Sequence, residues 1–209
     1  MNTTAVVVNY NTPELLRAAI SSIRKFYAQL PIIIVDGSEV CTIKELAQDP
    51  NILICHPRYN IGHGLGLEMG IKNVTTKNIL VFDSDIEMLK PCIELMEIAL
   101  KEDVYGVGLV VQVDETGHNV DKGIPYLHPH FALINKRHHI AFVHSGAPAL
   151  KAMRQLNNNK NLRLINMDVS RYVLHKERGT RVVVDEMERK GQIGKNAPVT
   201  HNHSTLKRS

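Results

Sequence analysis

The stretch ILVFDSDIEML, residues 79–89, places two carboxylates, Asp83 and Asp85, directly after a short apolar run. That run has the β-branched and aromatic content of a strand buried on both faces of a sheet. Three roles are open to the carboxylates at its end: an ordinary polar turn, a metal site for a phosphate-bearing substrate, or the nucleophile and acid of a phosphatase. A single D-x-D triplet does not choose among them, so the rest of the chain has to.

The residues before this stretch alternate between short β-branched runs and longer amphipathic runs. The strand-like runs are TAVVVNY (4–10), PIIIVD (31–36) and NILICH (51–56). The helix-like runs between them include PELLRAAISSIRKFYAQL (13–30) and LGLEMGIKNV (65–74). Strands that take turns with helices form βαβ units, so the sequence predicts an α/β fold with a mostly parallel central sheet and flanking helices.

Polar residues stand at the ends of three of these strands. In strand order they are Asn9, Tyr10 and Asn11, then Asp36 and Ser38, then Asp83 and Asp85. Ligands of an open parallel sheet bind at the carboxyl ends of its strands. We therefore expect these side chains to gather around one crevice, and three such strand ends make a mere turn at residues 83–85 less plausible than one would.

Composition limits the class of protein. The chain has 209 residues, of which 44% are hydrophobic, and this suits a single domain. A net charge of +4 with dispersed basic residues does not argue for nucleic acid. Three widely spaced cysteines form no disulfide framework, and we find no signal peptide and no transmembrane segment. We expect a cytoplasmic protein.

The second half of the chain has a different pattern. A strand-like run, VYGVGLVVQV (104–113), precedes a region rich in Gly, Pro and His, and helical patterns follow over 147–156 and 167–177, with a short strand over 180–186. We expect one domain, 1–209, in which residues 1–103 carry the parallel strands and 104–209 form a mixed or antiparallel half, with the C-terminal tail, on one side of the crevice.

Two further patterns attract attention. The segment NIGHGLGLEMG (60–70) has the wrong glycine spacing for a dinucleotide fingerprint, and close helix packing near a phosphate explains it. Eleven histidines include local pairs, but without a cysteine set they do not indicate a structural zinc site. The pairs are His128 and His130, His138 and His139, and His201 and His203.

The segments VVVNYNTPELLRAAISSI, IIIVDGSE, NIGHGLGLEMGI and ILVFDSDIEM, in this order and spacing, resemble the nucleotide-binding half of the GT-A glycosyltransferases, in particular the inverting, family-two-like enzymes. The resemblance extends over about the first 100 residues. It implies that Tyr10 packs on the nucleobase, that Asp36 bonds the base and that Arg58 meets the diphosphate. Asp83 then contacts the ribose and, with Asp85, the metal.

The resemblance also implies residues from the second half. A late histidine often completes the metal site in this family, which assigns His201 and His203, with the tail folded over the donor site. The base that takes the acceptor proton is acidic and stands at the start of a helix, which assigns Asp168, although an N-cap explains that residue equally well. Glu68 stands where the family often has Asn.

On this resemblance the chain is a glycosyltransferase that uses Mn²⁺ or Mg²⁺ to move a sugar from a nucleotide diphosphate sugar, expected to be a UDP-sugar, to an acceptor hydroxyl of a glycan, with inversion. A homo-oligomer is compatible with it. Two alternatives stay open: a non-catalytic GT-A-like module that binds nucleotide or glycan, and a phosphatase of the haloacid dehalogenase type. The second alternative is disfavoured because Glu87 stands where Thr or Val is usual.

Overall fold

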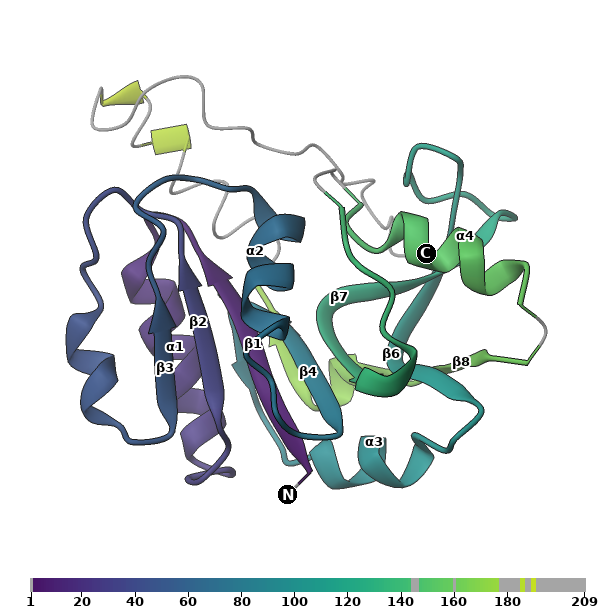
Figure 1. The fold of residues 1–209 in the computed structure, drawn as a ribbon, viewed down its shortest axis with the longest axis horizontal. Coiled ribbons are helices and arrows are strands. Elements are labelled where there is room, and N and C mark those ends of the chain that lie inside the picture. The colour runs from purple at the N-terminus through teal and green to yellow at the C-terminus, as the bar shows by residue number, and fades with distance from the viewer. Residues whose placement is uncertain (1, 144–146, 160, 177–184, 187–188, 191–209) are drawn as a thin grey trace.

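The computed structural model describes residues 2–143, 147–159, 161–176, 185–186 and 189–190 (Figure 1). No helix within these ranges is long and apolar enough to cross a membrane. In chain order the elements are β1 (Thr3–Asn9), α1 (Pro13–Arg24), β2 (Ile32–Asp36), the 3-10 turn η1 (Lys44–Gln48), β3 (Ile52–Cys55), α2 (His63–Ile71), β4 (Asn78–Asp83), β5 (Ile86–Met88), α3 (Ile93–Ala99), β6 (Val104–Val113), β7 (Ile124–Asn135), η2 (Lys136–His138), α4 (Leu150–Asn157), β8 (Arg163–Asn166), η3 (Val169–Arg171) and β9 (Val173–His175).

One sheet joins both halves of the chain. Its strand order is β3-β2-β1-β4-β7-β6-β8, and the strands from β3 to β4 are all parallel. β7 is antiparallel to both of its neighbours, β4 and β6, and β8 is parallel to β6. The predicted α/β class and the mixed second half are therefore confirmed.

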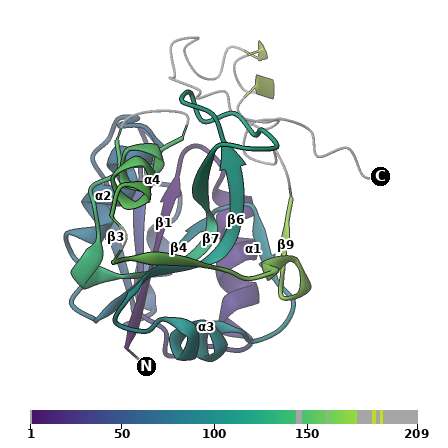
Figure 2. The same ribbon diagram turned by 90° about the vertical axis from the view of Figure 1, so that its right-hand side faces the viewer.

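Helices cover both faces of this sheet because consecutive strand residues point to opposite sides. Val7 belongs to the apolar cluster that includes residues of α1 and α3, whereas Val6 belongs to the cluster that includes residues of α2 and α4. Figure 2 shows α2 and α4 on one side of the strands and α1 on the other. The strand ends are thus held by a core on each face.

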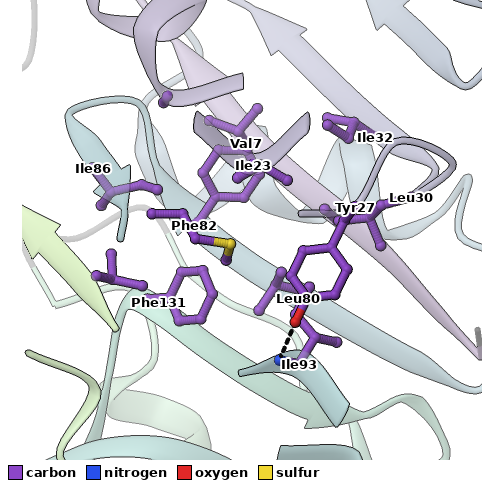
Figure 3. Packing of buried hydrophobic residues seen from close by; sticks show 14 of the residues in the cluster. Val7, Ile23, Tyr27, Leu30, Ile32, Leu80, Phe82, Ile86, Ile93 and Phe131 are labelled. Atoms are coloured by element: carbon purple, nitrogen blue, oxygen red, sulfur yellow. Dashed lines mark hydrogen bonds between the residues drawn. The ribbon is translucent and has the colours of Figure 1, made fainter. Parts of the chain in front are cut away.

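The cluster on the α1 side crosses the boundary between the two halves. Figure 3 shows Phe82 of β4 beside Phe131 of β7, with Val7 and Ile23 above them, and all four side chains are fully buried. Tyr27 closes the edge of this cluster, where its hydroxyl accepts a hydrogen bond from the backbone N–H of Ile93 at 2.9 Å. The carboxyl end of β4 therefore projects from a well-packed base.

The prediction of a helix over 167–177 is wrong. This segment forms the 3-10 turn η3 and the strand β9, which pairs with β5 in a separate two-stranded sheet. Val169 and Val173 are buried at a spacing that suits a helix, yet Val173 lies opposite Met88 in an antiparallel ladder. Tertiary pairing overrides the local pattern here. The helix expected over 147–156 does form, as α4, and the strand expected over 180–186 lies largely outside the described residues.

Candidate active site

The polar ends of β1, β2 and β4 lie side by side. In the parallel ladders Asn9 of β1 lies opposite Asp36 of β2, and Val8 of β1 lies opposite Asp83 of β4. Asp36 and Asp83 therefore flank the end of the same strand. These polar side chains therefore gather, as the sequence predicts, at the carboxyl edge of the parallel part of the sheet.

Asp36 is fully buried, and one of its carboxylate oxygens is heavily used. Oδ1 accepts hydrogen bonds from Asn9 Nδ2 at 3.0 Å, from the Ser38 hydroxyl at 2.6 Å and from the Ser38 backbone N–H at 3.2 Å. Oδ2 is buried and has no hydrogen-bond partner among the described residues. An unsatisfied buried carboxylate oxygen is costly, so it marks a position where a ligand N–H would be accepted.

The other two residues assigned to the nucleotide lie in the adjoining loops. Tyr10 directly follows β1 and is half-buried. Arg58 lies between β3 and α2, is exposed, and has a left-handed backbone with φ 69°. Such a conformation is uncommon for residues other than glycine and tends to occur near functional sites.

Asp83 and Asp85 form a compact group with a residue that the sequence did not single out, His175 of β9. His175 Nε2 lies 3.4 Å from Asp83 Oδ2 and 3.3 Å from Asp85 Oδ1. One ligand atom from each of the three residues lies within 4.8 Å of the others. Asp85 is almost completely buried, while Asp83 and His175 are partly exposed at the mouth of the site.

Charge interactions dominate the protonation of this group. Burial alone would raise the pKa of Asp83, but the hydrogen bond from His175 and the nearby imidazoles, His63 first, hold that pKa well below its usual range. Burial would likewise lower the pKa of His175, but its hydrogen bonds to Asp83 and Asp85 raise it to about 10. At neutral pH the metal-free group is therefore a cationic imidazole between carboxylates.

Further imidazoles surround these carboxylates. His63, the first residue of α2, places Nε2 3.6 Å from Asp83 Oδ1, on the side away from His175. His128 and His130 of β7 approach from the other half of the sheet, and the ring of His130 stacks on that of His175 with centroids 5.0 Å apart. Burial and the two neighbouring imidazoles lower the pKa of His130 to about 3, so that it is neutral.

The Asp83, Asp85 and His175 group fits a divalent cation. Two carboxylates supply hard oxygen ligands, as Mg²⁺ and Mn²⁺ prefer, and an imidazole nitrogen is a ligand that Mn²⁺ accepts more readily than Mg²⁺ does. With three protein ligands, an octahedral ion would keep positions for phosphate oxygens and water. The geometry therefore suits a cation that is shared with a diphosphate.

Sequence reasoning missed His175 because it placed residues 167–177 on a helix. No local pattern would have found it, because Val173 and Leu174 are both apolar and three residues are too few to show the period of a strand. The resemblance assigned a late histidine beside the carboxylates to His201 and His203. Among the described residues, it is His175 that lies in this position. His201 and His203 themselves lie outside the described residues.

Asp168, the predicted base, has local partners. It precedes η3 but makes no side-chain capping hydrogen bond. Its carboxylate accepts from the Ser170 hydroxyl at 2.5 Å and from Arg171 Nε at 2.9 Å, and these interactions lower its pKa. Both of these partners are close neighbours of Asp168 in the chain.

Glu68 of α2 also has a structural role. It is hydrogen-bonded to His139 Nε2 at 2.7 Å and to the backbone N–H of Phe142 at 2.8 Å. Burial would raise the pKa of Glu68, but these bonds outweigh it and lower the pKa. The residue that departs from the family pattern thus ties α2 to the segment that leads towards α4.

The strand order and the acidic group at the end of β4 are those of a GT-A-type domain. The chain belongs to glycosyl transferase family 2, whose model matches residues 4–153. This membership decides between the glycosyltransferase and the phosphatase interpretations of the D-x-D segment, in favour of the first.

Solved structures support the same fold. One is a mannosyltransferase from Pyrobaculum calidifontis, PcManGT, in complex with GDP-Man and Mn²⁺, which is 16% identical in sequence and superposes with a TM-score of 0.64. The match covers 80% of this chain and 55% of the PcManGT chain. Another is TarS 1-349 from S. aureus, in complex with UDP-GlcNAc, which is 15% identical in sequence and superposes with a TM-score of 0.61. The match covers 83% of this chain and 58% of the TarS chain. The chain thus spans less than two thirds of either protein. No curated protein sequence matches it.

Proposed function

We propose that this chain transfers a sugar from a nucleotide diphosphate sugar to an acceptor hydroxyl, with a divalent cation and with inversion, in the synthesis of a glycan. The observation that carries the proposal is the group of Asp83, Asp85 and His175 beside the orphaned oxygen of Asp36. Together they offer a cation site and a nucleobase contact on the two sides of β1. Family membership supplies the class of reaction.

Each residue has a distinct part in this proposal. Asp36 Oδ2 accepts an N–H of the base, Tyr10 packs on the base, and Arg58 meets the diphosphate. Asp85 and His175 hold the cation, and Asp83 is shared between the cation and the ribose. A bound Mn²⁺ or Mg²⁺ would neutralise the charge that develops on the leaving diphosphate. The similar structures contain GDP-Man in one case and UDP-GlcNAc in the other, so UDP and GDP are both to be tested.

Isothermal titration calorimetry of UDP and GDP, in EDTA and in Mn²⁺, tests the proposal. We expect one nucleotide to bind in Mn²⁺ only, and Asp85→Ala to remove both the metal dependence and most of the affinity. Glu87→Ala is the matched control, because Glu87 is a carboxylate two residues away that pairs with Lys176 outside the metal group. Equal binding with and without metal would refute the proposed role of the cation.

Asp168 as the base stays a prediction. Asp168→Asn keeps one acceptor oxygen, for either Ser170 or Arg171, and removes the base, so at this exposed position it is expected to preserve the fold and to lower turnover by about 100-fold or more. Turnover is measured as release of nucleotide in the presence of acceptor. An unchanged rate would leave Asp168 with the local structural role alone, and would favour a base elsewhere or a domain that only binds its ligands.

A further inference from the structure

The histidine pair on β7 borders the acidic group without belonging to it. The last ladder pair between β4 and β7 joins Phe82 to Phe131. Asp83 follows Phe82 and His130 precedes Phe131, so in this antiparallel pair both extend the ladder at the same end. The packed sheet itself therefore brings His130 to the carboxylates of the D-x-D segment.

His130 is held in one orientation. His130 is 6% exposed, and its ring contacts two others: that of His128, with centroids 4.7 Å apart, and that of His175, with centroids 5.0 Å apart and planes inclined by 26°. The backbone N–H of His130 donates to His128 Nδ1 at 3.3 Å, which makes that nitrogen an acceptor. The 2.8 Å contact between the two Nδ1 atoms then has His130 as its donor, and this fixes the tautomer of His130.

His175 has much less support from its own strand. β9 is only three residues long, pairs with β5 alone in a two-stranded sheet, and has His175 as its last residue. Val173 anchors this ribbon in the main core, and the backbone N–H of Lys176 donates to the backbone carbonyl of Asp85 at 2.9 Å, but these contacts hold the backbone of β9 and not the ring of His175. The carboxylates of Asp83 and Asp85 contact one ring nitrogen of His175, but they do not fix the plane of the ring. The stacked ring of His130, on a twelve-residue strand of the main sheet, does.

We propose that His130 is a positioning residue, which holds the ring of His175 by stacking so that Nε2 stays directed at the cation site between Asp83 and Asp85. The proposal rests on the metal site of the proposed function. Groups that orient a metal ligand typically change metal affinity by about 10–100-fold when they are removed. His130 is not one of the three candidate ligands, so it would act through His175.

Two substitutions separate stacking from hydrogen bonding. His130→Ala removes the stacked ring, whereas His130→Phe keeps an aromatic face of similar size and removes the hydrogen bond to His128. The measurements are Mn²⁺ affinity by electron paramagnetic resonance and the visible absorption spectrum of bound Co²⁺, which reports the ligand geometry. We expect His130→Ala to weaken Mn²⁺ binding by about 10–100-fold and to alter the Co²⁺ spectrum, and His130→Phe to restore most of both. His118→Ala, an exposed histidine in the hairpin between β6 and β7, is the control and is expected to bind like the wild type.

A double-mutant cycle with His175→Ala distinguishes positioning from general packing. If His130 acts through His175, its removal adds nothing to the loss already caused by His175→Ala. Additive losses, or unchanged Mn²⁺ binding by His130→Ala in a protein that folds normally by circular dichroism, would overturn the positioning role and leave the metal site standing. A wild-type protein that binds neither Mn²⁺ nor Co²⁺ would overturn the metal site of the proposed function and this role with it.

Discussion

At the scale of single residues, Asp36 has the arrangement that the proposed contact with a nucleobase requires. Three donors, from Asn9 and Ser38, converge on Oδ1, and this fixes the plane of the carboxylate. Oδ2 is left buried and without a hydrogen-bond partner among the described residues. The arrangement keeps an acceptor oriented for a ligand before any ligand arrives.

Asp36→Asn tests this interpretation. The amide keeps one oxygen for Asn9 and Ser38, but it presents an N–H group where the N–H of a nucleobase would have to donate. We expect the affinity for the preferred nucleotide to fall by about 10–100-fold, the range for loss of a hydrogen bond to a charged group, with little change in thermal stability. Calorimetry measures the affinity, and Asp103→Asn, an exposed carboxylate paired with Arg163, is the control. Unchanged affinity would show that Oδ2 is not a ligand contact.

His175 gives a second prediction at this scale, on pH. Its pKa of about 10 lies above the ordinary value of 6.5, so the cationic form stabilises the metal-free fold. That stabilisation is complete below about pH 6.5 and is lost as the pH rises through about 10. A metal needs the neutral imidazole, so binding has to displace a proton and to strengthen with rising pH over this window.

Calorimetry of Mn²⁺ binding in two buffers of different ionisation enthalpy, at pH 7.5, counts that proton. We expect release of about one proton by the wild type and of none by His175→Gln, which also binds more weakly. Identical observed enthalpies in the two buffers would show that His175 does not give up its proton to the metal.

At the scale of elements, α2 depends on glycine for its distance from the sheet. A Cβ added at Gly70 would lie 2.4 Å from Val6 Cγ1 and 3.3 Å from Val35 Cγ2, in a part of the core where the β-branched side chains are rigid. Gly66 faces Val8 of β1 in the same way. The glycines in residues 60–70 therefore serve close helix packing, as the sequence predicts.

Gly70→Ala measures this packing. Alanine favours a helix over glycine by about 1 kcal/mol, whereas overpacking of a core costs about 1–3 kcal/mol. Because the contact with Val6 is much closer than van der Waals distance, we expect the overpacking cost to exceed the gain in helix propensity. The midpoint of urea unfolding is then expected to fall. Leu65→Ala, at an exposed position of the same helix, is the control and is expected to change the midpoint less. A more stable Gly70→Ala variant would show that α2 moves away from the sheet at little cost.

At the scale of the whole molecule, the two halves share one core. The ladder between β4 and β7 joins them along five residue pairs, and the cluster around Val7 includes Phe131, Val107 and Val173 from the second half. Residues 1–103 alone would leave β4 as an exposed apolar edge strand. Residue 103 therefore does not separate two folding units.

Urea unfolding of the full chain is accordingly expected to show one transition, with far-UV and near-UV circular dichroism superimposed. The fragment 1–103 is expected to show no cooperative transition, because it lacks the partner strand of β4 and half of the shared cluster. Two separated transitions, or cooperative unfolding of the fragment, would contradict this view of the fold.

The amino-acid sequence determined those features that depend on local patterns. Alternating strand and helix periods specified the α/β class, and the polar residues after each strand specified which edge of the sheet carries the site. Asp36, Asp83 and Asp85 lie there because parallel strands end at a common edge whatever the details of packing. The order of four short segments was enough to identify the GT-A family, which the family match confirms.

Only the tertiary structure decided which residues of the second half reach that edge. Val169 and Val173 fit an amphipathic helix equally well, and pairing with β5, a strand far away in the chain, is what turns residues 173–175 into a strand and aims His175 at the carboxylates. His130 likewise reaches His175 because β7 pairs with β4. Contacts of this kind depend on the free energy of the whole packed core. The spacing of apolar residues within one segment does not predict them.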